Sequence, residues 1–294
     1  MSESRTKDPV GHEELASIPA QQQEWPGTEA KLQPDADHGE SWVGRERLTG
    51  KRALITGGDS GIGRAVAMTF AAEGADVAIT HLPQEKADAE ETRRLVEAKG
   101  RACHLIEADL RTADENRRVA REAVEQLGGL DVLVCNAAYQ MTHGEIEEFP
   151  EEQVERTFAT NVFSPFWLVR NLAGDLKPGS SVLITTSVQA YSPSEQLLDY
   201  AATKAALNNL VVNLAGDLGT RGIRVNAVAP GPIWTPLIPA TMPTKKVEGF
   251  GSDTPLGRAG QPVEVAAAFV FLASDEASYV SGTVLGVTGG KPVF

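Results

Sequence analysis

A glycine-rich turn between an apolar run and a helix-like segment constrains this chain more than any other feature. Residues 56–64 are Thr-Gly-Gly-Asp-Ser-Gly-Ile-Gly-Arg; the apolar run 53–55 precedes them and the alanine-rich stretch 65–72 follows. Glycines let the backbone turn tightly and approach a diphosphate, while the free N–H groups and the dipole of a helix start favour the anion. The strand, turn and helix order therefore predicts a dinucleotide-binding unit, although a glycine turn alone is more often only a tight loop.

A second pattern places three groups suited to proton chemistry near one another. Tyr200 and Lys204 lie four residues apart in a segment rich in alanine and leucine, and Ser187 follows the apolar run 182–185. On a helix the i and i+4 side chains share one face, so the ammonium can approach the phenol and favour its ionised form. Moving a tyrosine pKa from about 10 to about 7 corresponds to roughly 4 kcal/mol. A phenol tuned in this way can act as acid and base on a carbonyl or alcohol.

The alternation of short β-rich runs with helix-length stretches from Lys51 onward predicts the architecture. It indicates an α/β, Rossmann-like doubly wound sheet of seven parallel strands with helices on both faces. Such a fold binds its ligand at the carboxyl ends of the strands. The strands are expected at 53–56, 76–80, 102–107, 131–135, 181–185, 224–228 and 284–287, and the helices at 61–73, 85–99, 114–127, 151–171, 200–218 and 262–272.

Taken together and in this order, the motifs make the chain resemble the short-chain dehydrogenase/reductase family from about Leu48 to the C-terminus. Cys135 and Ala138 depart from the family's Asn-Asn-Ala-Gly pattern, but Asn136, its structurally important second Asn, remains. Within the family the chain is similar to bacterial oxidoreductases that carry a polar N-terminal extension. The other marks of the resemblance are Asp109-Leu110, Asn136-Ala137-Ala138, Asn161, Pro230-Gly231 and 287–290.

The resemblance implies an oxidoreductase that transfers a hydride between the nicotinamide of NAD(P) and an alcohol or carbonyl compound. It implies that Tyr200 is the general acid and base, that Lys204 lowers the tyrosine pKa and holds the nicotinamide ribose, and that Ser187 binds the reacting oxygen. Asn161 is expected to hold a water that relays protons to Lys204. The implied cofactor-binding residues are Gly57, Asp59, Ser60, Gly61, Ile62, Gly63, His81, Asp109, Leu110, Asn136, Ala137, Tyr200, Lys204, Pro230, Gly231, Ile233 and Thr235.

The resemblance also implies where the substrate binds and how the chain assembles. The segment 234–257, with its prolines and glycines, is expected to be a mobile lid over the substrate. Its mixed polarity allows a sugar, a small aldehyde or a ketone. Relatives pair the helices that contain Asn161 and Tyr200, so a homotetramer is expected. The implied substrate residues are Ser187, Gln189, Tyr191 and Leu197.

Two other functional classes are open alternatives. A non-catalytic dinucleotide-binding regulatory or scaffold protein can keep the same fold, but such proteins usually lose the tyrosine or the lysine, and this chain retains both. A protein of this fold can also catalyse epimerisation or dehydration, but those relatives usually show a different glycine spacing.

The cofactor expected from the sequence is NAD rather than NADP. Relatives that hold the 2′-phosphate commonly carry Arg or Lys just before the second motif glycine or just after the second strand, where this chain has Ser60 and 80–82, Thr-His-Leu. Asp59 adds negative charge that repels a phosphate dianion. The acidic residue that usually binds the 2′-hydroxyl is absent too, and a protonated His81 or Arg64 is the alternative that favours NADP.

Composition limits the remaining partners. The net charge is −13 and the acidic residues are spread widely, which argues against nucleic acid or an anionic membrane as a partner. The two cysteines lie in apolar runs and the five histidines show no ligand spacing, so neither a disulfide framework nor a metal site is expected. No apolar signal core and no run of membrane-spanning length is visible, so the prediction is a cytoplasmic protein.

Residues 1–47 differ in composition from the catalytic domain expected at 48–294. They are polar, interrupted by four prolines and without apolar periodicity, so they cannot build a core of their own. One interpretation is a disordered leader. Trp25, Leu32 and Trp42 are costly to leave in water and favour an extended arm docked in a groove. In similar members of the family this arm lies along the oligomer.

Overall fold

The computed structural model describes residues 8–10 and 13–294 and contains one sheet of seven parallel strands. The strand order is β3-β2-β1-β4-β5-β6-β7, so the chain reverses its direction of growth between β1 and β4, and the predicted fold class is confirmed. This reversal opens a crevice at the carboxyl ends of the two strands. The strands are β1 (Arg52–Ile55), β2 (Asp76–His81), β3 (Cys103–Glu107), β4 (Val132–Cys135), β5 (Ser181–Thr185), β6 (Arg224–Pro230) and β7 (Val284–Val287).

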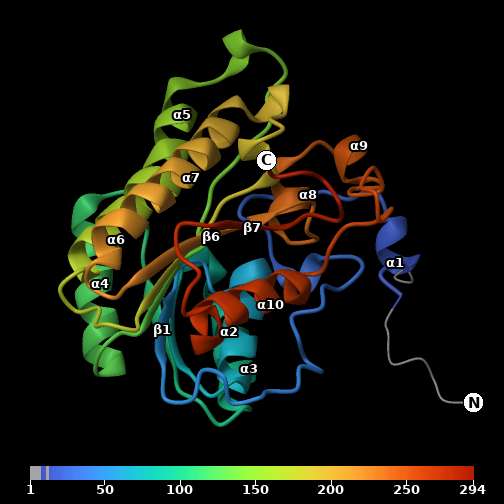
Figure 1. Cartoon of the computed structure of the whole chain (residues 1–294). Helices are drawn as coiled ribbons and strands as arrows, with labels where there is room; N and C mark the ends of the chain where they lie inside the picture. The colour runs from blue at the N-terminus through green and yellow to red at the C-terminus, as the bar shows by residue number, and fades with distance from the viewer. Residues whose placement is uncertain (1–7, 11–12) are drawn as a thin grey trace, which may run out of the picture.

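Helices cover both faces of the sheet (Figure 1). Each face has its own hydrophobic core, because successive side chains of a strand point to opposite faces. In β1, Ile55 belongs to one core and Leu54 to the other. One face carries α2 (Gly61–Ala72), α3 (Lys86–Glu97) and α10 (Pro262–Ala273); the other carries α4 (Ala113–Leu127), α5 (Glu151–Phe158), α6 (Ser164–Leu172) and α7 (Leu198–Gly219).

The helix predicted at 151–171 is interrupted by a π-helical turn, η4 (Ala159–Phe163), between α5 and α6. Pro165 explains the interruption: it has no N–H to donate to the carbonyl of Asn161, so the regular pattern of bonds to the fourth preceding residue cannot continue there. Such π-turns occur often at functional sites. Asn161 lies inside this one and is buried.

Short elements surround the crevice and connect the larger ones. None of the helices within residues 8–10 and 13–294 is long and apolar enough to cross a lipid bilayer. The short helices are α1 (Glu13–Ala16), α8 (Leu237–Thr241) and α9 (Thr244–Val247), and the 3₁₀ turns are η1 (Glu29–Lys31), η2 (Pro83–Glu85), η3 (Ile146–Glu148), η5 (Val188–Ala190), η6 (Glu195–Leu197) and η7 (Asp275–Ala277).

The described part of the N-terminal arm packs along the side of the molecule that carries α8, α9 and α10 (Figure 1). Leu15, Ile18 and Leu32 are buried in a cluster whose other members come from residues 234–259. Farther along the arm, the indole of Trp42 donates to the carboxylate of Glu73 at 2.9 Å. The arm therefore lacks a core of its own and completes a core that the domain supplies.

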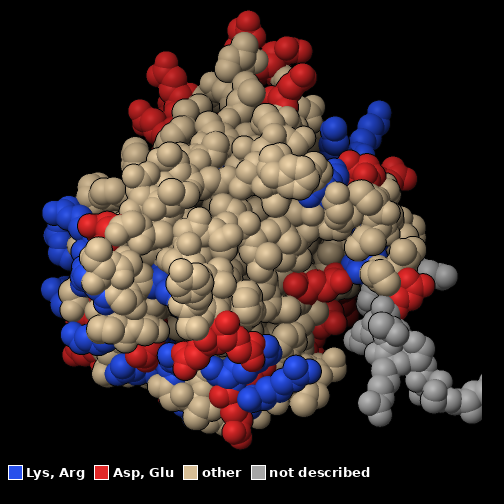
Figure 2. Space-filling model, viewed as in Figure 1, with Lys and Arg blue, Asp and Glu red and all other residues tan. Residues whose placement is uncertain are grey.

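Charged side chains are unevenly distributed over the face seen in Figure 2. Its centre, around β7 and the C-terminus, carries few Lys, Arg, Asp or Glu side chains, whereas both signs gather at the edges. All four residues of β7, an edge strand of the sheet, are partly exposed. Phe294 and Tyr279 are fully exposed.

Candidate active site

A cavity of about 610 Å³ opens at the carboxyl ends of the strands. Its walls come from the glycine turn, the segments after β2 to β6, the start of α7 and the lid at 234–257. Of the predicted cofactor residues, Gly63 alone does not line it. Those that do are Gly57, Asp59, Ser60, Gly61, Ile62, His81, Asp109, Leu110, Asn136, Ala137, Tyr200, Lys204, Pro230, Gly231, Ile233 and Thr235.

The glycine turn needs its glycines for two different reasons. Gly57 and Gly61 have φ values of 61° and 49°, a region that side chains rarely allow. Gly63 is required by close packing, because a Cβ there would lie 1.8 Å from the Gly57 carbonyl oxygen. Gly63 therefore holds the start of α2 against the turn, while Ser60, Gly61 and Ile62 face the cavity.

Asn136 ties three neighbouring strands together at the crevice. Its Nδ2 donates to the carbonyl oxygens of Thr56 and Gly57, at 3.2 Å and 3.1 Å. Its Oδ1 accepts from the hydroxyl of Thr185 at 3.1 Å. These bonds join the ends of β1, β4 and β5, which explains why this Asn is retained although its neighbours in the motif differ from the family pattern.

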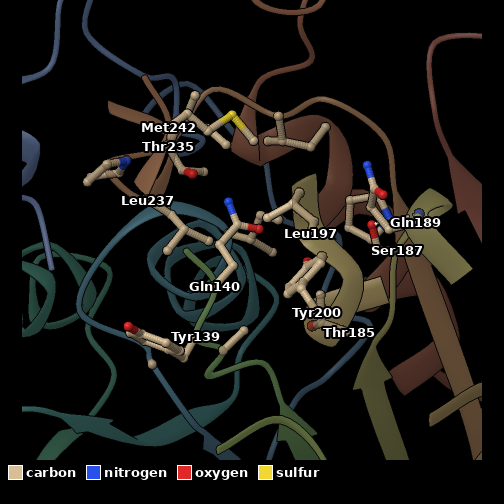
Figure 3. A pocket seen from close by; sticks show the side chains of 18 of the residues that line it. Tyr139, Gln140, Thr185, Ser187, Gln189, Leu197, Tyr200, Thr235, Leu237 and Met242 are labelled. Carbon is tan, nitrogen blue, oxygen red and sulfur yellow. Dashed lines mark hydrogen bonds between the residues drawn. The ribbon is translucent and has the colours of Figure 1, made fainter. Parts of the chain in front are cut away.

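Tyr200, Lys204 and Ser187 meet at one side of the cavity, with Leu237 and Met242 of the lid region opposite them (Figure 3). The Lys204 ammonium is buried, donates to the Thr185 carbonyl oxygen at 2.8 Å and lies 5.2 Å from the centroid of the Tyr200 ring. The Ser187 side chain lies close enough to the Tyr200 phenol to affect its pKa. The spacing expected from the sequence thus brings the three groups into one corner.

The electrostatics of this corner differ from the expectation. Burial raises the pKa of Tyr200 to about 12, although the Ser187 side chain opposes the rise. Burial lowers the pKa of Lys204 to about 7. The sequence predicts that Lys204 lowers the tyrosine pKa; in this structure desolvation of the phenol has the larger effect and has the opposite sign. Tyr200 is therefore a neutral phenol at pH 7, the protonation state of a proton donor.

Asn161 lies outside the cavity and is fully engaged by protein groups. Its Oδ1 accepts from the Tyr139 N–H at 2.8 Å, and its Nδ2 donates to the Tyr139 carbonyl at 2.9 Å and to the Thr203 hydroxyl at 3.1 Å. It links the loop after β4 to α7, immediately before Lys204. The side chain thus braces this loop against α7. That Asn161 also holds a water that relays protons stays a prediction.

Three of the four predicted substrate residues line the cavity: Ser187, Gln189 and Leu197. Tyr191 does not line it. The sequence correctly placed the loop after β5 but did not indicate the direction in which this side chain leaves it.

Trp25 and Arg156 line the cavity and were missed by the sequence prediction. The guanidinium carbon of Arg156 lies 4.1 Å from the centroid of the Trp25 ring and 4.3 Å from that of Tyr139. The cost of exposing an indole pointed to docking of Trp25, but no sequence signal connects positions 25 and 156. The cavity wall here depends on a contact between distant parts of the chain.

Two acids in the wall of the cavity, Asp59 and Glu85, have raised pKa values. Burial raises the pKa of Asp59 to about 6. The pKa of Glu85 is raised to about 8, mainly by burial and to a smaller extent by the charge of Asp59. Arg64 points away from the cavity and donates to the carbonyls of Asp59 and Asp88 and to Thr92. Arg111 lines the cavity and is paired with Asp109.

Comparison with known proteins identifies relatives along almost the whole chain. Residues 57–291 match the family model described as enoyl-(acyl carrier protein) reductase. The uncharacterized oxidoreductase YhxD of Bacillus subtilis is 49% identical over 297 residues, which cover 99% of each chain. The NADPH-dependent aldehyde reductase 1, chloroplastic, of Arabidopsis thaliana is 46% identical over 286 residues, 95% of this chain and 99% of the relative.

A solved structure gives the same picture of the domain. The short-chain dehydrogenase from Burkholderia cenocepacia J2315 in complex with NADP is 35% identical, with a TM-score of 0.78, and the match covers 83% of this chain and 99% of that one. About a sixth of this chain therefore has no counterpart there. That share is similar in length to the N-terminal arm.

The comparisons show that the expectation of NAD was wrong. The Burkholderia structure contains NADP, and the Arabidopsis relative is named as NADPH-dependent. The argument from the sequence looked for basic residues at two positions, with a protonated His81 or Arg64 as the alternative, and counted Asp59 as a negative charge. Asp59 is buried, which raises the pKa of its carboxyl, and the cavity is lined by Arg111 and Arg156.

The strand order and the glycine turn agree with these matches. A family model that matches residues 57–291, and a relative 49% identical across 99% of the chain, show that this chain belongs to the short-chain dehydrogenase/reductase family.

Proposed function

We propose that this chain is an NADPH-dependent reductase of small aldehydes or ketones, in which Tyr200 donates the proton. The observation that carries the proposal is the corner formed by Tyr200, Ser187 and Lys204 in the wall of the cavity. A neutral phenol is the form needed to protonate a carbonyl oxygen while hydride adds to its carbon. Reduction is therefore the favoured direction.

The residues around the crevice fit a dinucleotide. A Cβ at Gly61 would lie 2.9 Å from the Thr235 side chain, so this part of the turn leaves only the backbone to face the cavity. Ile62 lines the cavity at the start of α2, where a backbone N–H suits a diphosphate, whereas the Gly61 N–H donates to Glu29. We assign Asp109 and Leu110, which line the cavity, to the dinucleotide, and Ile233 and Thr235 to its carboxamide. When bound, the nicotinamide supplies the hydride.

The two hydroxyls of the corner have complementary roles toward the substrate oxygen. The Ser187 oxygen accepts the N–H of Gln189 at 3.1 Å, which leaves its own proton free to be donated. Tyr200 donates its proton as negative charge develops on the substrate oxygen. Lys204, whose pKa is lowered by burial to about 7, can take up and release a proton near neutrality and restore that of Tyr200.

The wall around this corner supports a small, partly polar carbonyl substrate. Leu197, Leu237 and Met242 supply apolar surface, while the amides of Gln140 and Gln189 supply hydrogen-bonding groups (Figure 3). Gln140 is itself fixed by a bond from its Nε2 to the Thr241 hydroxyl at 2.9 Å. An aldehyde that carries hydroxyl groups matches this mixture.

We also propose that the protein is a homotetramer. Phe163, Phe166 and Val212, on the outer side of α6 and α7, are about half exposed, at 50%, 46% and 58%. Burial of such side chains between subunits removes apolar surface from water. The partly exposed edge of β7 and the uncharged face around it offer a second contact. Light scattering at micromolar concentration tests this, and a monomer would contradict it.

Oxidation of NADPH with a panel of aldehydes and ketones tests the proposed activity. We expect turnover with at least one small aldehyde, and at least ~10-fold higher kcat/KM with NADPH than with NADH, which corresponds to about 1.4 kcal/mol. Binding of NADPH without turnover of any carbonyl compound would favour the non-catalytic alternative. Equal use of the two cofactors would contradict the proposed preference.

A further inference from the structure

The N-terminal arm crosses the cavity from the lid to the glycine turn. At one end of residues 23–29, the Gln23 N–H donates to the Pro239 carbonyl in α8 at 2.9 Å. At the other end, the Glu29 carboxylate accepts the Gly61 N–H at the start of α2 at 2.6 Å. Trp25 and Pro26 lie between these two anchors and line the cavity. Residues 23–29 therefore form a strap over the crevice.

Between its two ends, the strap is held by contacts among two aromatic rings and an arginine. The Trp25 and Tyr139 rings contact edge to face, with centroids 5.6 Å apart and planes at 71°. Arg156 of α5 lies against both rings, within 4.1 Å and 4.3 Å of their centroids. Tyr139 lies across the cavity from Ser187 and Gln189 (Figure 3). Trp25 thus reaches from the lid to the wall formed by the loop after β4 and by α5.

Arg156 is a cation available to an anion in the cavity. Among the residues that the structure describes, no carboxylate lies within 4.0 Å of its guanidinium, and its contacts are the two ring faces. Stacking leaves the N–H groups at the edge of the guanidinium plane free to donate. Arg156 and Asp109 both line the cavity. The pKa of Asp109 is lowered mainly by its hydrogen bond with Arg111, and the charge of Arg156 lowers it further. A planar guanidinium held in this way suits a phosphate oxygen.

At the other anchor, the carboxylate of Glu29 lies next to the glycine turn, and a neighbouring histidine compensates its negative charge. Glu29 is nearly buried, and its carboxylate also contacts Nε2 of His38 at 2.9 Å. His38 is itself close to Glu40, at 3.6 Å. Although burial opposes it, hydrogen bonds to Glu29 and Glu40 raise the pKa of His38 to about 9. The protonated histidine therefore offsets the charge of Glu29, and the strap can be tied to α2 without repelling a diphosphate.

We propose that residues 23–29 form a strap over the dinucleotide and that Trp25 and Arg156 belong to the cofactor site. Arg156 donates to a phosphate of the cofactor, and Trp25 holds the guanidinium plane in place. The proposal rests on the proposed use of NADPH. It assigns to the arm a part of the active site.

Equilibrium binding of NADPH to the full-length protein, without substrate, tests this. We expect Trp25→Ala and Arg156→Gln each to raise the Kd for NADPH about 10-fold, mainly through faster dissociation. Trp25→Phe keeps a ring and should recover part of the loss. The double variant should bind no more weakly than about the weaker single variant, because Trp25 acts through Arg156.

Trp42→Ala is the matched control. Trp42 is also an arm tryptophan next to an arginine, Arg47, but it lies outside the cavity. We expect it to lower Tm while leaving the Kd for NADPH within about twofold of the wild type. Arg156→Gln removes only the head of a half-buried side chain, so it carries the test if Trp25→Ala does not fold.

The outcomes separate the two proposals. A wild-type protein that binds neither NADPH nor NADH would overturn the proposed function and the strap with it. A wild type that binds NADPH, with Kd unchanged in Arg156→Gln and in the folded Trp25 variants, would overturn the strap alone. An equal loss of affinity in Trp42→Ala would also overturn it, because the arm would then act only through stability.

Discussion

Helix α7 and the N-terminal arm both supply walls of the cavity, but different interactions position them. In α7 the two functional side chains, Tyr200 and Lys204, are placed by the local geometry of one helix. The arm has almost no regular structure, and its position depends on partners far away in sequence, such as the bond from the Trp234 indole to the Pro34 carbonyl across 200 positions. Local placement leaves a pattern in the sequence, and long-range placement leaves almost none.

The two regions also differ in what burial does to their side chains. Leu15, Ile18 and Leu32 of the arm gain from leaving water. Tyr200 and Lys204 lose, because burial shifts each pKa away from the charged form. The arm therefore stabilises the fold around the site, whereas α7 holds chemical groups in a state that costs stability. Substitutions in the two regions should separate activity from stability.

The largest effect is expected from removing the proton donor in α7. Tyr200→Phe should lower kcat at least ~100-fold, because the ring remains and only the transferred proton is lost. The Kd for NADPH should change little. Steady-state kinetics with a substrate found in the carbonyl panel measures this, and Tyr191→Phe is the control, since Tyr191 lies in the same region but outside the cavity. Equal rates for wild type and Tyr200→Phe would remove Tyr200 from the mechanism.

The second effect tests the arm. Leu32 is only 2% exposed and packs in the cluster that includes Trp234 and Val247 of the lid. Leu32→Ala should lower the free energy of unfolding by about 3 kcal/mol, the usual cost of truncating a buried leucine. Chemical denaturation measures it, with Val43→Ala as the control, because Val43 is 81% exposed. If both variants were equally stable, the arm could not be an integral part of the core.

The sequence predicted the sheet well because the central strands are apolar runs that both faces of a parallel sheet bury. The strands at Ser181–Thr185 and Val284–Val287 begin and end where predicted, and the glycine turn enters α2 at Gly61. The π-turn was missed, because the consequence of Pro165 for the preceding turn depends on how the helix packs. Sequence periodicity describes an ideal helix and not its local widening.

The site was predicted in outline, and the errors have physical causes. Spacing predicted that Tyr200 lies near Lys204, but it did not indicate that both groups are buried, and burial shifts both pKa values. The contact between Trp25 and Arg156 was invisible, because it joins an irregular segment to α5. The cofactor preference failed for a related reason: the sequence did not indicate that Arg111 and Arg156, from distant segments, line the same cavity.

The smallest effect in this comparison concerns the stability that is lost by burying the Lys204 ammonium. Burial lowers the pKa of Lys204 to about 7 from its ordinary 10.5. Below pH 7 the lysine is charged in both the folded and the unfolded state, and the folded state bears the whole desolvation cost. Between pH 7 and 10.5 the unfolded state binds more protons than the folded state. The free energy of unfolding therefore rises with pH over this range, until the desolvation cost of the ammonium no longer applies.

Lys204→Met removes this cost at any pH and should therefore stabilise the protein most in acid. The pKa difference alone corresponds to about 5 kcal/mol, but loss of the bond to the Thr185 carbonyl offsets part of it, and we expect a gain of about 2 kcal/mol at pH 6 that shrinks toward pH 9. Denaturation curves at the two pH values measure the gain, with exposed Lys177→Met as the control. Activity should fall at the same time, because Lys204 restores the proton of Tyr200. A gain that is the same at both pH values would mean that the ammonium carries no burial cost, and α7 would then resemble the arm in adding only to stability.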